Sequence, residues 1–166
     1  MKSFAAVALL VLTAACAPKP AANDAQMISD ALRNGCKAVE ARDVEGMIAP
    51  FLKEDPDKLE MFDFATPRSR GYAKLKQANA DFVANITGQP VCQYLSIKPV
   101  ILSPDAAYSV AIMRAAGTLK SGQSLDFTIR STDVWRKVDG QWKIVHEHNS
   151  FPVDMATGVP DFQSKE

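Results

Sequence analysis

The two histidines of the chain, His146 and His148, lie two residues apart near its C-terminal end. In an extended strand such a pair points to one face, so both imidazoles would share a surface. An imidazole suits proton abstraction near neutral pH, and two neutral imidazoles could begin a metal site. A metal would need a third ligand, for which Asp63 is the available donor, while hydrogen bonds satisfy an imidazole equally well. We therefore predict no metal and no other cofactor, and weigh His148 as a general base against a purely structural role.

Asp63, flanked by two phenylalanines, is the other candidate for chemistry. A carboxyl group in an apolar pocket has a raised pKa and can act as an acid or a base. The alternative is an ion pair that keeps the carboxylate ionised and inert, and the candidate partners are Arg68, Arg70 and Arg130. The planar guanidinium of Arg130 could instead bind an anionic ligand.

An antiparallel hairpin would position most of these groups. Residues 124–138 and 141–151 have the pattern of two long strands, and Asp139-Gly140 between them is a strong turn signal. With a two-residue turn, His148 lies opposite Ser131 and away from Arg130. A longer turn or a single bulge reverses this match, so the spacing alone leaves both registers open.

The rest of the chain must supply the scaffold for this hairpin. Helical spacing of apolar side chains predicts helices over residues 23–41, 43–52 and 72–86, with Asn23 and Gln26 as a capping box and Asp43 as a second N-cap. After a break at residues 87–90, strands are predicted at 91–102 and 106–119, besides a short one at 60–65, and Pro99 indicates a bulge or an edge position. Helices first and hairpins last favour an α+β fold, in which a curved antiparallel sheet wraps around three N-terminal helices as a cone.

The hairpin also carries a family resemblance. The string Arg-x-Thr at residues 130–132, followed by Gly-x-Trp-x-Ile-x-His-x-His-x-Ser at residues 140–150, resembles the C-terminal signature of SnoaL-like proteins in the nuclear-transport-factor-2-like superfamily. The resemblance covers roughly residues 26 to 154. It implies a cone-shaped domain, dimeric through its sheet, and a pocket that includes Arg130, Thr132, His146 and His148, which favours the bulged register. The superfamily hosts isomerases, dehydratases, cyclases, hydrolases and binding domains, so membership does not fix an activity.

The N-terminal end is typical of an exported protein. Residues 1–15 have a basic start and a short apolar run, and residues 12–16 resemble a bacterial lipoprotein box with Cys16 as the lipidated residue. Plain export and an uncleaved anchor are the alternatives. Residues 16–22 would form the lipidated tether, 23–154 the domain and 155–166 a tail. We expect a cell-envelope protein anchored on the periplasmic side, with the outer membrane favoured. In such an oxidising space Cys36 and Cys92 could form a disulfide, or remain two buried thiols.

Length and charge narrow the functions further. The chain has 166 residues, enough for one domain, and its 19 basic residues balance 19 acidic ones. A neutral chain has no field to hold a polyanion, which argues against nucleic acid as a partner. We expect a module that binds a small, partly apolar or carboxylate-bearing molecule at Asp63, Arg130, Thr132, His146 and His148. The alternatives are a proton-transfer enzyme of isomerase or dehydratase type that uses Asp63 or His148 as base, and a dimeric envelope assembly module. The sequence does not decide whether the protein is an enzyme.

Overall fold

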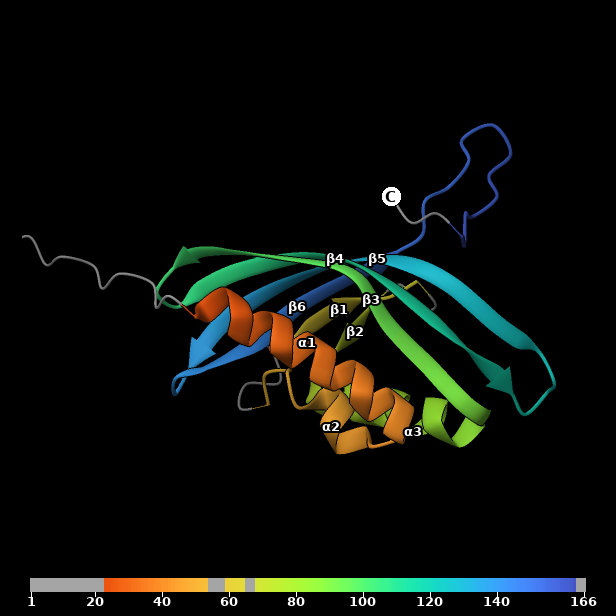
Figure 1. Ribbon diagram of the computed structural model, residues 1–166, viewed down its shortest axis with the longest axis horizontal. Helices are drawn as coiled ribbons and strands as arrows, with labels where there is room; N and C mark the ends of the chain where they lie inside the picture. The colour runs from red at the N-terminus through yellow and green to blue at the C-terminus, as the bar shows by residue number, and fades with distance from the viewer. Residues whose placement is uncertain (1–22, 54–58, 65–67, 164–166) are drawn as a thin grey trace, which may run out of the picture.

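The fold combines one curved sheet with three helices on one of its faces (Figure 1). The structure is a computed structural model that describes residues 23–53, 59–64 and 68–163. Its helices are α1 (Asp24–Ala41), α2 (Val44–Ile48) and α3 (Tyr72–Asn85). Its strands are β1 (Glu60–Phe62), β2 (Ser69–Arg70), β3 (Ile86–Ser103), β4 (Ala106–Leu119), β5 (Ser124–Val138) and β6 (Gln141–Ser150). The α+β class and the curved sheet over N-terminal helices are confirmed. The predicted signal peptide, Cys16 and the tether lie outside the described residues.

The sheet has the strand order β2-β1-β6-β5-β4-β3. Consecutive hairpins join β3 to β6, as predicted, and β3 with Pro99 is an edge strand. The short strand β1 pairs in parallel with β6, and Ser69–Arg70 form β2 beside it. Neighbours so distant in sequence are set by tertiary contacts, which a local residue pattern does not report.

Two of the predicted local features, the cap of α1 and the break at residues 87–90, differ from the structure. Asn23 has φ −104° and ψ 2°, outside the extended region that an N-cap requires, and its side chain makes no cap hydrogen bond. Gln26 donates to Asp30 instead, so the predicted capping box is wrong. Asp43 is extended and accepts from the Gly46 N–H at 3.1 Å, as predicted. The expected break at residues 87–90 is a register irregularity inside β3, which absorbs Pro90 without ending the strand.

The core lies between the helices and the concave face of the sheet. Trp135, Trp142 and Ile144 from the last hairpin are buried against Ile28 of α1 and Ile48 of α2. Both indole N–H groups have partners, since Trp135 donates to Ser109 Oγ at 2.9 Å and Trp142 to Asp24 Oδ1 at 3.0 Å. The tryptophans are therefore packing residues of the core. Within the described ranges, no helix is long and apolar enough to span a bilayer.

Candidate functional site

A single bulge fixes the register of the last hairpin. Trp135 pairs with Ile144, but the next pair joins Val134 to His146, which leaves Val145 as the extra residue. Beyond it, Thr132 faces His148 and Arg130 faces Ser150. The bulged register that the family resemblance favoured is therefore present.

The bulged row, however, faces away from the helices. Ile129, Ser131 and Asp133 are buried beneath the helical layer, whereas Arg130, Thr132 and His148 are exposed and His146 is half-buried. The reason is strand alternation: Trp135 anchors the odd-numbered residues of β5 inward, and the bulge aligns the histidines with the even-numbered row. The expectation that Arg130, Thr132, His146 and His148 line the hollow of the cone is thus wrong in its geometry.

On the outer face these residues make structural contacts. His146 Nδ1 lies 2.9 Å from the carbonyl oxygen of Glu60, which pins β1 to β6. Phe62 meets both imidazole rings edge-on, with centroids 5.3 and 5.9 Å away. Arg130 Nη2 donates to the carbonyl oxygen of Phe151 at 3.1 Å. These contacts join β1 to β6, and β5 to the residue that follows β6.

A cavity of about 330 Å³ lies on the other side, between the helices and the sheet. Its walls are mostly apolar and come from α1, α3 and the concave faces of β3, β4 and β5, including Leu32, Val39, Leu75, Phe82, Ala115 and Phe127. Its polar groups include Asp63, Tyr94, Ser131, Glu147 and Asn149. Of the residues predicted to bind a ligand, the structure therefore places Asp63 alone in the described wall of this cavity.

The polar groups gather where β5 and β6 cross the cavity. Asn149 Nδ2 donates to Glu147 Oε1 at 2.9 Å, and Glu147 pairs across the sheet with Asp133. Asp133 in turn accepts from the hydroxyls of Ser109 at 2.7 Å and Ser131 at 3.2 Å. Two carboxyl groups with only neutral hydrogen-bond partners thus lie side by side on the concave face of the sheet.

Burial changes the ionisation of this pair. Desolvation raises the pKa of Glu147 to about 8, with further upward contributions from Asp133 and Asp63, against the hydrogen bond from Asn149. Desolvation also raises the pKa of Asp133 to about 6, against its two serine hydrogen bonds and the charge of His146. Desolvation of Tyr94 raises the pKa of its hydroxyl well above the usual value, and the nearby charges of Asp133 and Glu147 raise it further. Near neutral pH the protonation of Asp133 therefore depends on that of Glu147, and the two carboxyl groups titrate as a coupled pair.

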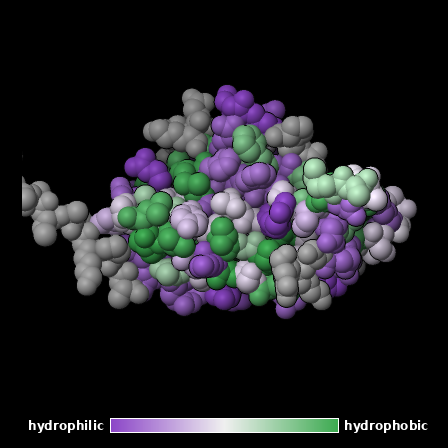
Figure 2. Space-filling model, turned by 90° about the horizontal axis from the view of Figure 1, so that it is seen from above, coloured by the Kyte–Doolittle hydropathy of each residue, from purple (hydrophilic) through white to green (hydrophobic). Residues whose placement is uncertain are grey.

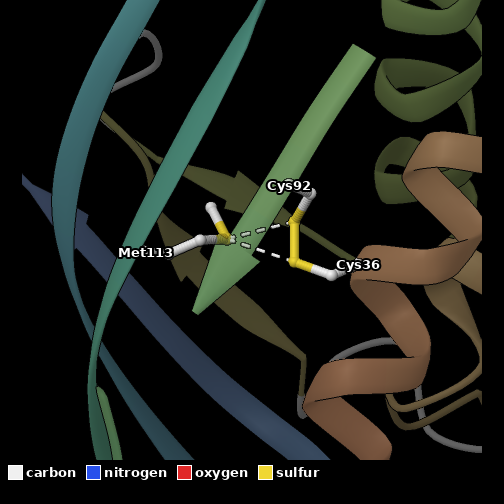
Figure 3. Close-up of a disulfide and its surroundings, with 3 residues drawn as sticks. All are labelled: Cys36, Cys92 and Met113. Atoms are coloured by element: carbon white, nitrogen blue, oxygen red, sulfur yellow. Dashed lines mark hydrogen bonds between the residues drawn. A yellow bond between two sulfur atoms is a disulfide. The ribbon is translucent and has the colours of Figure 1, made fainter. Parts of the chain in front are cut away.

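A disulfide ties the helical layer to the sheet along the cavity wall. Cys36 of α1 and Cys92 of β3 are bonded, with their Cα atoms 5.0 Å apart, so of the two alternatives for these cysteines the disulfide is the one present. Met113 of β4 places its Sδ 3.5 Å from Cys92 Sγ and 3.9 Å from Cys36 Sγ (Figure 3). All three residues line the cavity.

The sequence reasoning missed Asp133, Glu147, Asn149 and Tyr94. The signal that marks the inner row of β5 is Trp135, because a large aromatic side chain on a strand identifies the face that is buried. Reading backward from it at every second residue gives Asp133 and Ser131. The inner row of β6 could not be found this way, since the bulge interrupts its alternation.

Comparison with known proteins agrees with this architecture. Residues 28–154 match the SnoaL-like domain, so the chain belongs to the SnoaL-like domain family. No curated protein matches the chain.

Several solved structures share the fold. An NTF2-like protein from Pseudomonas putida KT2440 superposes with a TM-score of 0.74 at 24% identity, over 89% of this chain and 100% of its own. A protein with a cystatin-like fold from Caulobacter vibrioides superposes with a TM-score of 0.63 at 19% identity, over 75% of this chain and 87% of its own. A ketosteroid isomerase-like protein from Erwinia carotovora atroseptica SCRI1043 superposes with a TM-score of 0.64 at 17% identity, over 78% of this chain and 96% of its own. At these identities the likeness concerns the fold alone.

Proposed function

We propose that this SnoaL-like domain binds a small, largely apolar molecule in the cavity between its helices and its sheet. The observation that carries the proposal is the cavity itself, about 330 Å³ with apolar walls and a few convergent polar groups. Such a combination is typical of small-molecule sites, where apolar walls supply affinity and a few polar groups fix orientation. Among the described lining residues there is no lysine, arginine or histidine, so a carboxylate-bearing ligand is not favoured.

A cavity-filling variant tests this proposal. Ala115 lines the cavity on β4, and Ala106, at the start of the same strand, does not. We expect the wild type and Ala106→Phe to enhance the fluorescence of the neutral apolar dye Nile red, and Ala115→Phe to lose that enhancement. Native mass spectrometry of freshly purified protein would add the mass of any molecule retained. Equal dye binding by all three proteins would overturn the proposal.

Proton transfer is the second candidate, and the ionisation of the cavity carboxyls favours it. Glu147 has a pKa of about 8 and can hold its proton at neutral pH, while Asp63 lies in the same cavity wall and is exposed. One carboxyl that remains protonated and one open to water match the roles of hydrogen-bond donor and base toward a carbonyl compound. His148 lies on the other face and is not a base for this cavity.

A small unsaturated ketone tests the catalytic candidate. We expect the enzyme to convert 3-cyclohexenone into its conjugated isomer with a bell-shaped pH dependence, and Asp63→Asn to abolish the reaction. His148→Asn is the matched control and should retain the rate. An unchanged rate in Asp63→Asn would contradict the candidate.

Export and lipid anchoring remain proposals for the region before residue 23. We propose that Cys16 carries the lipid and holds the domain on the periplasmic side of a bacterial envelope. Fractionation of cells that express the full chain tests this, because Cys16→Ala should move the protein from the membrane fraction to the soluble one. Retention of Cys16→Ala in the membrane fraction would contradict the anchor.

A further inference from the structure

The charged groups of the cavity are acidic. Glu147 and Asp63 lie in its described lining, and Asp133 lies directly beside Glu147. The electrostatic influences on Glu147 from Asp133 and Asp63 both oppose its ionisation, and its hydrogen-bond partner, Asn149, is neutral. A group inside the cavity that carried a positive charge would reverse this balance.

Four basic side chains on or next to the surrounding elements are engaged elsewhere. Arg42, at the end of α1, donates to backbone carbonyls, including that of Ile86 at 3.0 Å. Lys76 of α3 pairs with Glu45, and Lys137 of β5 pairs with Asp24 at the far end of the core. His146 lies on the outer face of β6 with its Nδ1 against Glu60. To neutralise a carboxylate in the cavity, each of these side chains would have to leave its present partner.

Tyr94 provides a second, independent indication of a ligand. Its side chain lines the cavity and is half-buried. Within the described part of the chain, its hydroxyl has no hydrogen-bond partner. No unpartnered polar atom of the described side chains is sealed from solvent, so this hydroxyl opens onto the cavity, where its oxygen can accept a hydrogen bond from a ligand N–H group.

The walls suit the remainder of such a ligand. The rings of Phe51, Phe64, Phe82, Phe127 and Tyr94 all line the cavity. Aromatic faces attract ammonium groups and also pack against apolar chains. We infer that the cavity takes an organic amine in its ammonium form, with the charged nitrogen between Glu147 and Tyr94 and its apolar body among these rings. The inference rests on the proposed binding function and names the class of its ligand.

A matched series of probes tests the inference. The probes 4-phenylbutylammonium, 4-phenylbutanol and 4-phenylbutanoate share one apolar body and differ in charge. By isothermal titration calorimetry near neutral pH, we expect the ammonium to bind at least about tenfold more tightly than the alcohol, and the carboxylate to bind most weakly. Because the cation favours the ionised form of Glu147, binding should release up to one proton, measured by repeating the titration in buffers of different ionisation enthalpy.

Glu147→Gln keeps the shape of the site and removes its titratable group. We expect this variant to lose the preference for the ammonium and to keep its affinity for the alcohol. The control is Glu45→Gln on α2, outside the cavity, which should bind like the wild type. Equal affinity for alcohol and ammonium, or an unchanged preference in Glu147→Gln, would overturn the inference while the binding function stands. Failure of all three probes to bind would overturn the binding function and the inference with it.

Discussion

Asp133 and Glu147 lie directly opposite each other on β5 and β6, and both side chains face the helical layer. Like charges at directly opposed positions of a sheet destabilise it, and desolvation adds to that cost. The pair therefore retains a proton at pH values where exposed carboxylates are fully ionised, with the pKa of Glu147 raised to about 8 and that of Asp133 to about 6. This relationship makes the stability of the domain depend on pH.

The first prediction concerns the pH dependence of folding. Because burial raises the pKa of Glu147 from 4.5 to about 8, its proton stabilises the folded state fully below pH 4.5, and that stability is lost as pH rises through about 8. We expect Glu147→Gln to exceed the wild type in free energy of unfolding by about 2 kcal/mol near pH 9, and to match it near pH 5. Urea denaturation at both pH values measures this, with Glu45→Gln as control. Part of the slope should persist in Glu147→Gln, because the raised pKa of Asp133 acts in the same direction. Parallel pH profiles for Glu147→Gln and the wild type would contradict the prediction.

The second prediction concerns the bond between α1 and β3. Cys36 and Cys92 are 56 residues apart, a separation for which a disulfide stabilises by about 4 kcal/mol through the entropy of the unfolded chain. We expect the double variant Cys36→Ser with Cys92→Ser to lose about that much in urea denaturation. Dithiothreitol should destabilise the wild type and leave the double variant unaffected. Met113→Leu keeps the bond and serves as the packing control. A wild type insensitive to the reductant, at a concentration that mass spectrometry shows to reduce the bond, would contradict this role.

The third prediction separates the outer face from the cavity. His148→Ala and Arg130→Ala should leave binding in the cavity unchanged, since both side chains lie on the other side of the sheet. His146→Ala should cost about 1–2 kcal/mol of stability, because it removes the hydrogen bond to Glu60 that holds β1. Calorimetric titration with the phenylbutyl probes and urea denaturation provide the two readouts. A loss of probe affinity in His148→Ala, with unchanged stability, would contradict the prediction and show that this imidazole takes part in binding.

The fourth prediction concerns assembly through the outer face of the sheet. Exposed apolar side chains lie on this side, with Val110 at 40%, Val134 at 38% and Phe62 at 39% exposure. Figure 2 shows this side of the molecule, where apolar patches lie among polar groups. Such a face suits a second copy of the domain, the arrangement that the family resemblance implies.

Light scattering coupled to gel filtration tests that assembly. We expect a dimer for the wild type and a monomer for Val134→Glu, because the carboxylate would be buried without a partner. Ala73→Glu, on the exposed side of α3, should remain dimeric. A wild type that is monomeric at high micromolar concentration would contradict the prediction.

The comparison of sequence and structure shows which patterns were informative. Strands β4 and β5 have the predicted bounds, because each is a long alternating run between clear turn residues. The capping of α2 by Asp43 also followed from a local rule. The capping of α1 did not, because Asp24 is held by distant partners, Trp142 and Lys137, which no window around residue 24 contains.

The site was the least predictable part. Neither glycine nor proline marks Val145 as a bulge, and no neighbouring residue has an unusual character. The alternation expected for β6 put Trp142, Ile144 and His146 on one face, whereas the bulge separates His146 from the other two. One residue of register in β6 therefore exchanged the histidines for Glu147 and Asn149 in the cavity, while Arg130 lies outside because Trp135 sets the inward row of β5.

The unpaired Val145 has a consequence for comparing this domain with other members of its family. A protein with the same residues in its last strand but without this bulge would turn both imidazoles toward its interior, and the side chains that match Glu147 and Asn149 toward water. Two chains with identical motifs would in that way place imidazoles in one cavity, and acidic and amide groups in the other, against a bound ligand. Before a function is assigned to one of them from the other, the strand register of the final hairpin should be compared first, and the identity of the residues second.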